Sequence, residues 1–389
     1  MRSSSSFLAP AALAFALAAA LPASAQAAQA ELTIDVATHT VPGMPGLGAL
    51  GRLSGAMGGA SPSYGMARHP GMPGRYMDVA LHNRAAPGQP ARQAVPKGLQ
   101  LGNSIDLLPP GDAPAASNDS APPDALGQAG DGKFRIHYYW GCGDQVRAGQ
   151  PAEYAVTIRN GKMVTTGRAM AQRQVPQASV EPGPRHALWP NPSARKAVGG
   201  KASLVGTHAV TGEALPASMQ FELGRDHDFL PELKLRSEGD AAKGPSLRWD
   251  GVDGARAYFI HGTAMDGETI VMWSSSEDGY AGHELMDFLP EQLVTQWTGK
   301  RTLMNADARS CRIPPGVFTG SGGSGAPMLQ MIAYGNDRSI TQSGWSVRVR
   351  SKSTAMLMPG GGAGASPGEV AKPAAKEAAK GLLRGLIGR

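Results

Sequence analysis

The chain has 389 residues, which is enough for two domains of about 100–200 residues each. Its 52 glycines and 31 prolines, with only 17% charged residues, predict long turns and connecting segments without regular structure. The formal net charge is +6, but no stripe of lysine and arginine runs through the body of the chain, which excludes nucleic acid as an expected partner.

The N-terminal residues have the pattern of a secretory signal peptide. Arg2 precedes an apolar run over residues 7–21, and the sequence Ala-Ser-Ala ending at Ala25 matches a small-x-small cleavage site. The run is shorter than the ~20 residues that a membrane span needs, which argues against a transmembrane anchor. We therefore predict a signal peptide over residues 1–25, with cleavage as late as residue 30, and a periplasmic or secreted mature protein.

Alternating apolar residues predict a first β domain over residues 31–235. The alternation that begins at Leu32 is typical of a strand with one buried face. Two low-complexity segments, residues 42–74 and 109–133, interrupt this domain. We expect both to be flexible, disordered insertions, because such compositions do not bury enough apolar surface to offset the entropy lost on ordering.

Cys142 and Cys311 are the only cysteines in the chain. Export into an oxidising compartment favours their pairing. Glycines on both sides of Cys142 leave room for another backbone to approach closely. We predict a disulfide that ties the N-terminal half of the chain to the C-terminal half.

The clearest structural pattern lies in residues 247–262, where two alternating apolar runs flank a cluster of Gly and Asp. The first run ends at Trp249 and the second begins with Gly-Ala-x-x-Tyr at Tyr258, which predicts two antiparallel strands. This spacing resembles the second and third strands of fibronectin type III and related immunoglobulin-like domains. The resemblance implies a second β-sandwich domain over residues 236–356, although a stretch at 284–297 predicts one or two inserted short helices.

The closing strand of this second domain has one apolar and one charged side. Trp345 and Val347 are expected to face the core, whereas Arg348 and Arg350 are expected to face solvent. Such one-sided alternation is typical of an antiparallel sheet.

The predicted fold class is therefore all-β, with two immunoglobulin-like β-sandwich domains, disordered insertions and a C-terminal amphipathic helix. The run Tyr-Trp-Gly-Cys-Gly at residues 139–143, followed by a second domain of this kind, resembles a family of uncharacterised exported bacterial proteins. That likeness implies no function, and a fold of this kind serves many functions.

The C-terminal residues differ in character from the rest. After a Gly- and Pro-rich linker over residues 357–368, residues 369–389 have a helical composition with a basic and an apolar stripe. We expect an amphipathic helix that contacts an anionic membrane surface or a partner groove. The alternative is a frayed solubilising tail, because so short an isolated helix is marginal in water. The basic residues expected to make the contact are Lys372, Lys376, Lys380 and Arg384.

Two segments suggest metal chemistry. The run His283-Glu284-x-x-Asp287 resembles the zinc-protease helix but lacks its second histidine, which favours polar residues at a helix start. The first low-complexity segment is rich in methionine, and thioether sulfur suits Cu(I). The candidate ligands are Met66, His69, Met72 and Met77.

No segment brings together an acid, a base and a nucleophile, so we expect no cofactor and favour a protein without catalytic activity. The leading hypothesis is an exported cell-envelope protein that binds or supports an envelope component or a protein partner. One alternative is a periplasmic copper-handling protein that uses the methionine-rich segment. Another is a hydrolase whose His, Asp and Ser meet only in the folded chain.

Overall fold

The computed structural model describes residues 28–42, 62–69, 72–110, 132–159, 162–167, 175, 179–240, 243–267, 269–279, 282–318 and 327–359. The predicted signal peptide, most of both low-complexity segments and the C-terminal helix with its four basic residues lie outside these ranges. Within them, strands dominate and form three sheets, so the prediction of a mostly β protein is confirmed. No helix among these residues is long and apolar enough to cross a bilayer.

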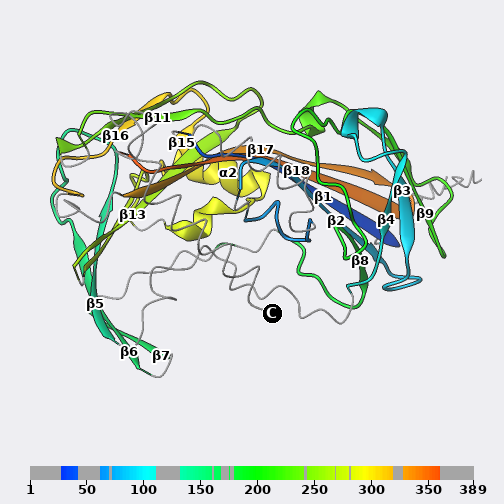
Figure 1. Cartoon of the computed structure of the whole chain (residues 1–389), viewed down its shortest axis with the longest axis horizontal. Helices are drawn as coiled ribbons and strands as arrows, with labels where there is room; N and C mark the ends of the chain where they lie inside the picture. Colours follow the sequence, from blue (N-terminus) through cyan, green and yellow to red (C-terminus); the bar gives the residue numbers. More distant parts are fainter. Residues whose placement is uncertain are drawn as a thin grey trace, which may run out of the picture.

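Sheet A contains eleven strands and runs the length of the molecule (Figure 1). In spatial order its strands are β7 (Lys162–Gly167), β6 (Ala152–Arg159), β5 (Gly132–Trp140), β14 (Thr269–Ser274), β13 (Ala257–Asp266), β17 (Met328–Gln342), β18 (Trp345–Leu357), β1 (Ala30–Thr40), β2 (Gly74–Asn83) and β8 (His186–Trp189), with β15 (Met304–Asn305) also paired to β13.

Two smaller sheets pack against sheet A. Sheet B consists of β10 (Gln220–Leu223), β9 (Gly206–Gly212), β3 (Ala91–Ala94) and β4 (Ser104–Leu107), and sheet C of β11 (Leu235–Glu238), β12 (Ser246–Trp249) and β16 (Ser310–Arg312). The helices named within the described ranges are the 3₁₀ helices η1 (Lys97–Leu99), η3 (Arg225–His227) and η5 (His283–Met286) and the α-helix α2 (Glu291–Gly299). The last two confirm the short helices predicted within the second domain.

The hairpin of β17 and β18 contributes side chains to two separate apolar cores. Val347 and Val349 lie in a first apolar core that sheet B covers, whereas Ala355 and Leu357 lie in a second core that sheet C covers. All four side chains project from the same face of β18, because side chains two residues apart share a face of a strand. We call the two regions the first and second lobes, and the hairpin is common to both.

Sheet A also crosses the predicted domain boundary at residue 235. β1 pairs in parallel with β18, and β5 pairs in parallel with β14. The two predicted domains therefore share one continuous sheet.

The two strands predicted within residues 247–262 are present, but they do not pair with each other. β12 lies in sheet C and β13 in sheet A. β12 and β13 face each other across the second core, and the ring centroids of Trp249 and Tyr258 are 5.6 Å apart. The Tyr258 hydroxyl accepts the backbone N–H of Val252 at 3.0 Å, which fixes the connection between the two sheets.

The predicted disulfide between Cys142 and Cys311 is confirmed, with 5.2 Å between the two Cα atoms. Cys142 follows β5 and Cys311 lies in β16, so the bond joins sheet A to sheet C. Because 169 residues separate the two cysteines, it ties together parts of the chain that are distant in sequence.

Candidate functional site

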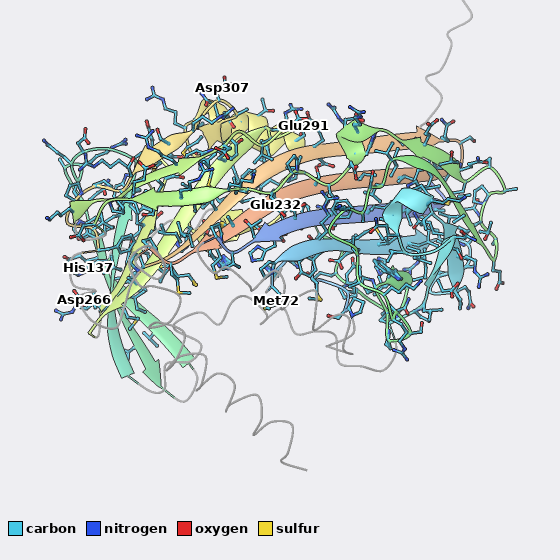
Figure 2. The ribbon with its side chains drawn as sticks, turned by 45° about the horizontal axis from the view of Figure 1, so that its top comes forward. Met72, His137, Glu232, Asp266, Glu291 and Asp307 are labelled. Carbon is cyan, nitrogen blue, oxygen red and sulfur yellow. A yellow bond between two sulfur atoms is a disulfide. The ribbon has the colours of Figure 1, made fainter. Side chains whose placement is uncertain are left out.

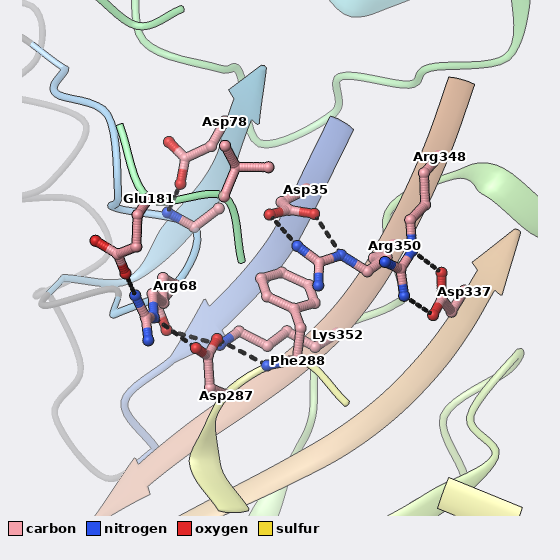
Figure 3. A network of polar contacts seen from close by, with 12 residues as sticks. Asp35, Arg68, Asp78, Glu181, Asp287, Phe288, Asp337, Arg348, Arg350 and Lys352 are labelled. Atoms are coloured by element: carbon pink, nitrogen blue, oxygen red, sulfur yellow. Dashed lines mark hydrogen bonds and ion pairs between the residues drawn. The ribbon is translucent and has the colours of Figure 1, made fainter. Parts of the chain in front are cut away.

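A cluster of charged side chains lies on the face of sheet A opposite the two apolar cores (Figure 3). Two segments cover it: the turn at residues 62–69, and residues 283–288, which include η5. Phe288 packs there against Ala37 and Ala67, both fully buried. We call this group the charged cluster, and its members are Asp35, Arg68, Asp78, Glu181, Asp287, Arg350 and Lys352.

The centre of the charged cluster is a buried ion pair between Asp35 and Arg350. The two residues face each other in the β1–β18 register, and Arg350 Nε and Nη2 donate to the two carboxylate oxygens at 2.7 and 2.6 Å. Their side chains are 5% and 1% exposed. The Phe288 ring lies 5.0 Å from the Arg350 guanidinium carbon, a cation–π contact. Burial raises the pKa of Asp35, and the guanidinium opposes that rise.

Lys352 lies two residues after Arg350, on the same face of β18. Its Nζ donates to the carbonyl oxygens of Arg68 and Met286 at 2.6 and 3.2 Å and lies 3.5 Å from Asp287 Oδ1. Burial lowers the pKa of Lys352, and the Asp287 carboxylate opposes this effect. The ammonium group therefore fastens both covering segments to the same strand.

Asp287 links the covering segments to each other. Arg68 Nε donates to Asp287 Oδ2 at 2.5 Å, and Arg68 Nη1 donates to Glu181 at 2.8 Å. Burial alone would raise the pKa of Asp287, but Lys352 and Arg68 outweigh it and hold that pKa below its ordinary value. Asp287 is thus an ionised carboxylate that bridges two cations.

Among the described residues, no cation forms an ion pair with Asp78. It lies directly opposite Asp35 in the β1–β2 pair, and its Oδ2 accepts the backbone N–H of Ala67 at 2.9 Å. Burial, and then the charge of Asp35, raise the pKa of Asp78 well above its ordinary value. Two adjacent buried carboxyl groups disfavour the ionisation of both, and Arg350 offsets this effect at Asp35.

Three imidazole rings lie beside the charged cluster. The ring centroids of His69 and His283 are 6.5 Å apart, and those of His283 and His261 are 6.3 Å apart. Burial lowers the pKa of His261 to about 3, and burial together with Lys352 lowers that of His69 to about 4. No group of three or more His, Cys, Asp or Glu side chains has the arrangement of a metal site in the described part of the chain.

His39 and Thr354 form a further hydrogen-bonded pair. His39 Nδ1 lies 2.7 Å from the Thr354 hydroxyl, the distance of a base and a nucleophile. Both residues are 5% exposed, however, so no substrate can reach the hydroxyl in this structure. Burial lowers the pKa of His39 to about 4, with a smaller contribution from Lys352.

Of the four predicted metal ligands, Met77 lies apart from the other three. Met77 is 3% exposed in the first apolar core, because alternation along β2 turns it away from Asp78 and the charged cluster. Met72 is 40% exposed before the start of β2 (Figure 2). Met66 and His69 lie in the covering turn, where His69 contacts His283. Met77 is therefore not available as a ligand in this fold, whereas metal binding by Met66, His69 and Met72 stays a prediction.

Sequence reasoning did not find the charged cluster. Arg350 was expected to face solvent and is instead buried, because residues 62–69 and 283–288 cover the second face of β18. The run at His283 was considered for its metal chemistry, yet Asp287 serves as an ion-pair partner. The available signal was a row of alternating cations, Arg348, Arg350 and Lys352, on a strand whose other face is apolar.

Comparison with known proteins gives no match: no family model, no curated protein and no solved structure is similar to the chain.

We predict that Arg350→Met lowers the free energy of unfolding by about 3–5 kcal/mol, because it leaves the Asp35 carboxylate buried without its partner. The double variant Asp35→Leu/Arg350→Met should recover most of the loss, since an apolar pair requires no charge compensation. Arg236→Met, in an exposed ion pair with Asp250, is the control and should change stability little. Urea unfolding measures all three, and equal midpoints for Arg350→Met and Arg236→Met would contradict the assignment.

The buried histidines predict acid sensitivity. The folded-state pKa of His261 is about 3, and an unfolded histidine has a pKa near ~6.5, so only the unfolded state binds this proton at intermediate pH. The stability is present above pH ~6.5 and is lost as the pH falls towards 3, at up to about 1.4 kcal/mol per pH unit. Urea midpoints measured from pH 7 to pH 4 should fall less steeply for His261→Gln than for the unsubstituted protein; parallel curves would refute this.

Proposed function

We propose that the chain is an exported, non-catalytic cell-envelope protein that binds or supports a partner. The observation that carries this proposal is the closure of the charged cluster, in which buried Asp35 is bonded to Arg350, and buried Lys352 to Asp287 and to backbone carbonyls. Shifted pKa values mark functional sites in many enzymes, but structural ion-pair networks shift them as well. Here the charges are occupied in holding strands and covering segments together.

The second lobe supports a binding module. When the two-residue strand β15 is left aside, its first, second and fifth strands in chain order, β11, β12 and β16, form one sheet, and β14, β13, β17 and β18 lie side by side in the other. This is the arrangement that the resemblance to fibronectin type III domains implies. We infer that residues 235–357 form a sandwich of that type, with its second sheet extended by strands of the first lobe.

The disulfide supports the proposed export to the periplasm or the medium. Disulfides persist in the periplasm and outside the cell and are rare in reducing cytosol. Together with the N-terminal signal pattern, the bond between Cys142 and Cys311 favours export. The basic residues between 372 and 384 would then meet the anionic surfaces of the envelope.

No observation favours the two alternatives. For the copper-handling hypothesis, one of the four candidate ligands, Met77, is buried in the first apolar core. The hydrolase hypothesis needs an accessible nucleophile, and the hydroxyl paired with His39 is closed to solvent.

Fractionation of a bacterial host that makes the full chain with a C-terminal tag tests the export proposal. We expect the protein in the periplasm or the medium, with an N-terminus between residues 26 and 31 and no free thiol. The matched variant Leu13→Arg/Leu17→Arg, which interrupts the apolar run, should stay unprocessed in the cytosol. An unprocessed, reduced, cytosolic protein with the unsubstituted sequence would overturn the proposal.

A further inference from the structure

The first lobe is closed along one side and open along the other. On the closed side, a β-bridge between Leu108 and Leu188 joins sheet B to sheet A. On the open side, β10 is the last strand of sheet B, and β17 beyond Tyr334 pairs only with β18 among the described residues. We call the gap between β10 and residues 337–342 the open seam.

A groove of about 520 Å³ lies in the open seam. Phe221, Ile340 and Trp345 give it apolar surface, and Gln220 and Gln342 add amide groups. Its volume is in the range of ordinary binding sites, about 300–1,000 Å³.

Both ends of the open seam are bounded. At one end the Asn336 amide donates to the carbonyl oxygen of Asp226 at 2.9 Å. At the other end Trp345 Nε1 donates to the Ser218 hydroxyl at 3.4 Å. Residues 337–342 of β17, which lie between these ends, span about 20 Å of extended strand.

The backbone N–H and C=O groups along this edge of β17 can pair with another strand. Ser343 and Gly344 form the two-residue turn between β17 and β18, and Gly344 has a positive φ of 85°. Gln342 and Trp345 close the hairpin, so alternate residues direct their backbone groups towards β18 and away from it. Asp337, Ser339 and Thr341 therefore present their N–H and C=O groups to the open seam. An unpaired edge of this kind is a template for strand addition.

The charge of the groove indicates the occupant. Glu222 is the one charged residue that lines it, and within the described residues no cation lies within ion-pair distance of its carboxylate. An entering segment with a lysine or arginine would complement this charge, and its alternate apolar side chains would cover Phe221 and Ile340.

We propose that the open seam binds an extended peptide segment of a partner, which adds as a strand to β17 and places a basic side chain against Glu222. This inference rests on the proposed function as a binding protein and names the chemistry of what is bound. A peptide is indicated rather than a small molecule, because the edge offers a row of backbone donors and acceptors.

The test uses a fluorescent hexapeptide, Val-Thr-Lys-Thr-Val-Thr, blocked at both ends, in which Lys and both Val share one face of the strand, and measures its anisotropy with the full mature protein. We expect saturable binding that Ser339→Pro weakens by about tenfold or more, because proline removes an outward N–H and leaves the bonds to β18 intact. Ser339→Ala keeps the N–H and should bind as the unsubstituted protein does. A peptide with Glu in place of Lys should bind more weakly, and Glu222→Gln should reduce that difference.

Hydrogen exchange keeps the test decisive if Ser339→Pro does not fold. In the unsubstituted protein, added peptide should slow exchange at the backbone N–H groups of Ser339 and Thr341 and leave the far edge at β4 unchanged. The proposal is overturned by no binding, by equal binding to the proline variant, or by a dimer of the chain that occupies this edge. Each of these results leaves the export experiment, and with it the proposed function, standing.

Discussion

Burial on both faces of β18 is the constraint on which the structure depends. One face supplies Val347 and Val349 to the first core and Ala355 to the second. The opposite face carries Arg350 and Lys352, which are about 1% exposed. A charge in such a position is costly unless it is paired and hydrogen-bonded, and the pairing determines what must lie above the strand.

The partners of these two cations come from distant parts of the sequence. Asp35 belongs to the first strand of the fold, Arg68 to the covering turn and Asp287 to the segment between η5 and α2. The same interactions that satisfy the charges therefore attach two irregular segments to the sheet. In a network of this kind each partner is needed, because the loss of one leaves another charge buried and uncompensated.

The apolar alternation was sufficient to predict the mostly β composition, because period two is a local property of the sequence. The short helices near residue 290 were predicted from a helix-like stretch that follows no single period. The disulfide was predictable from the presence of two cysteines and a signal pattern. The burial of Arg350 was not. Alternation shows which side chains share a face, but it does not show whether another segment covers that face. The covering turn lies in a Gly- and Met-rich stretch without periodicity, and 315 residues separate Asp35 from Arg350.

Because the β17–β18 hairpin contributes to both cores, the molecule consists of two lobes built on one sheet. A break at residue 235 would separate β1 from β18 and β5 from β14. The lobes differ in their edges: the second is tied by a disulfide between its sheets, whereas the first has an open side between β10 and β17. The rigid and the accessible parts of the molecule are thus distinct.

Native-state hydrogen exchange tests most directly whether the hairpin makes the lobes one cooperative unit. The slowest backbone N–H groups of β9 in the first lobe and of β13 in the second should exchange with the same free energy of opening, and low concentrations of urea should lower both together. A first lobe that opens at a distinctly lower free energy, while β13 stays protected, would contradict the account.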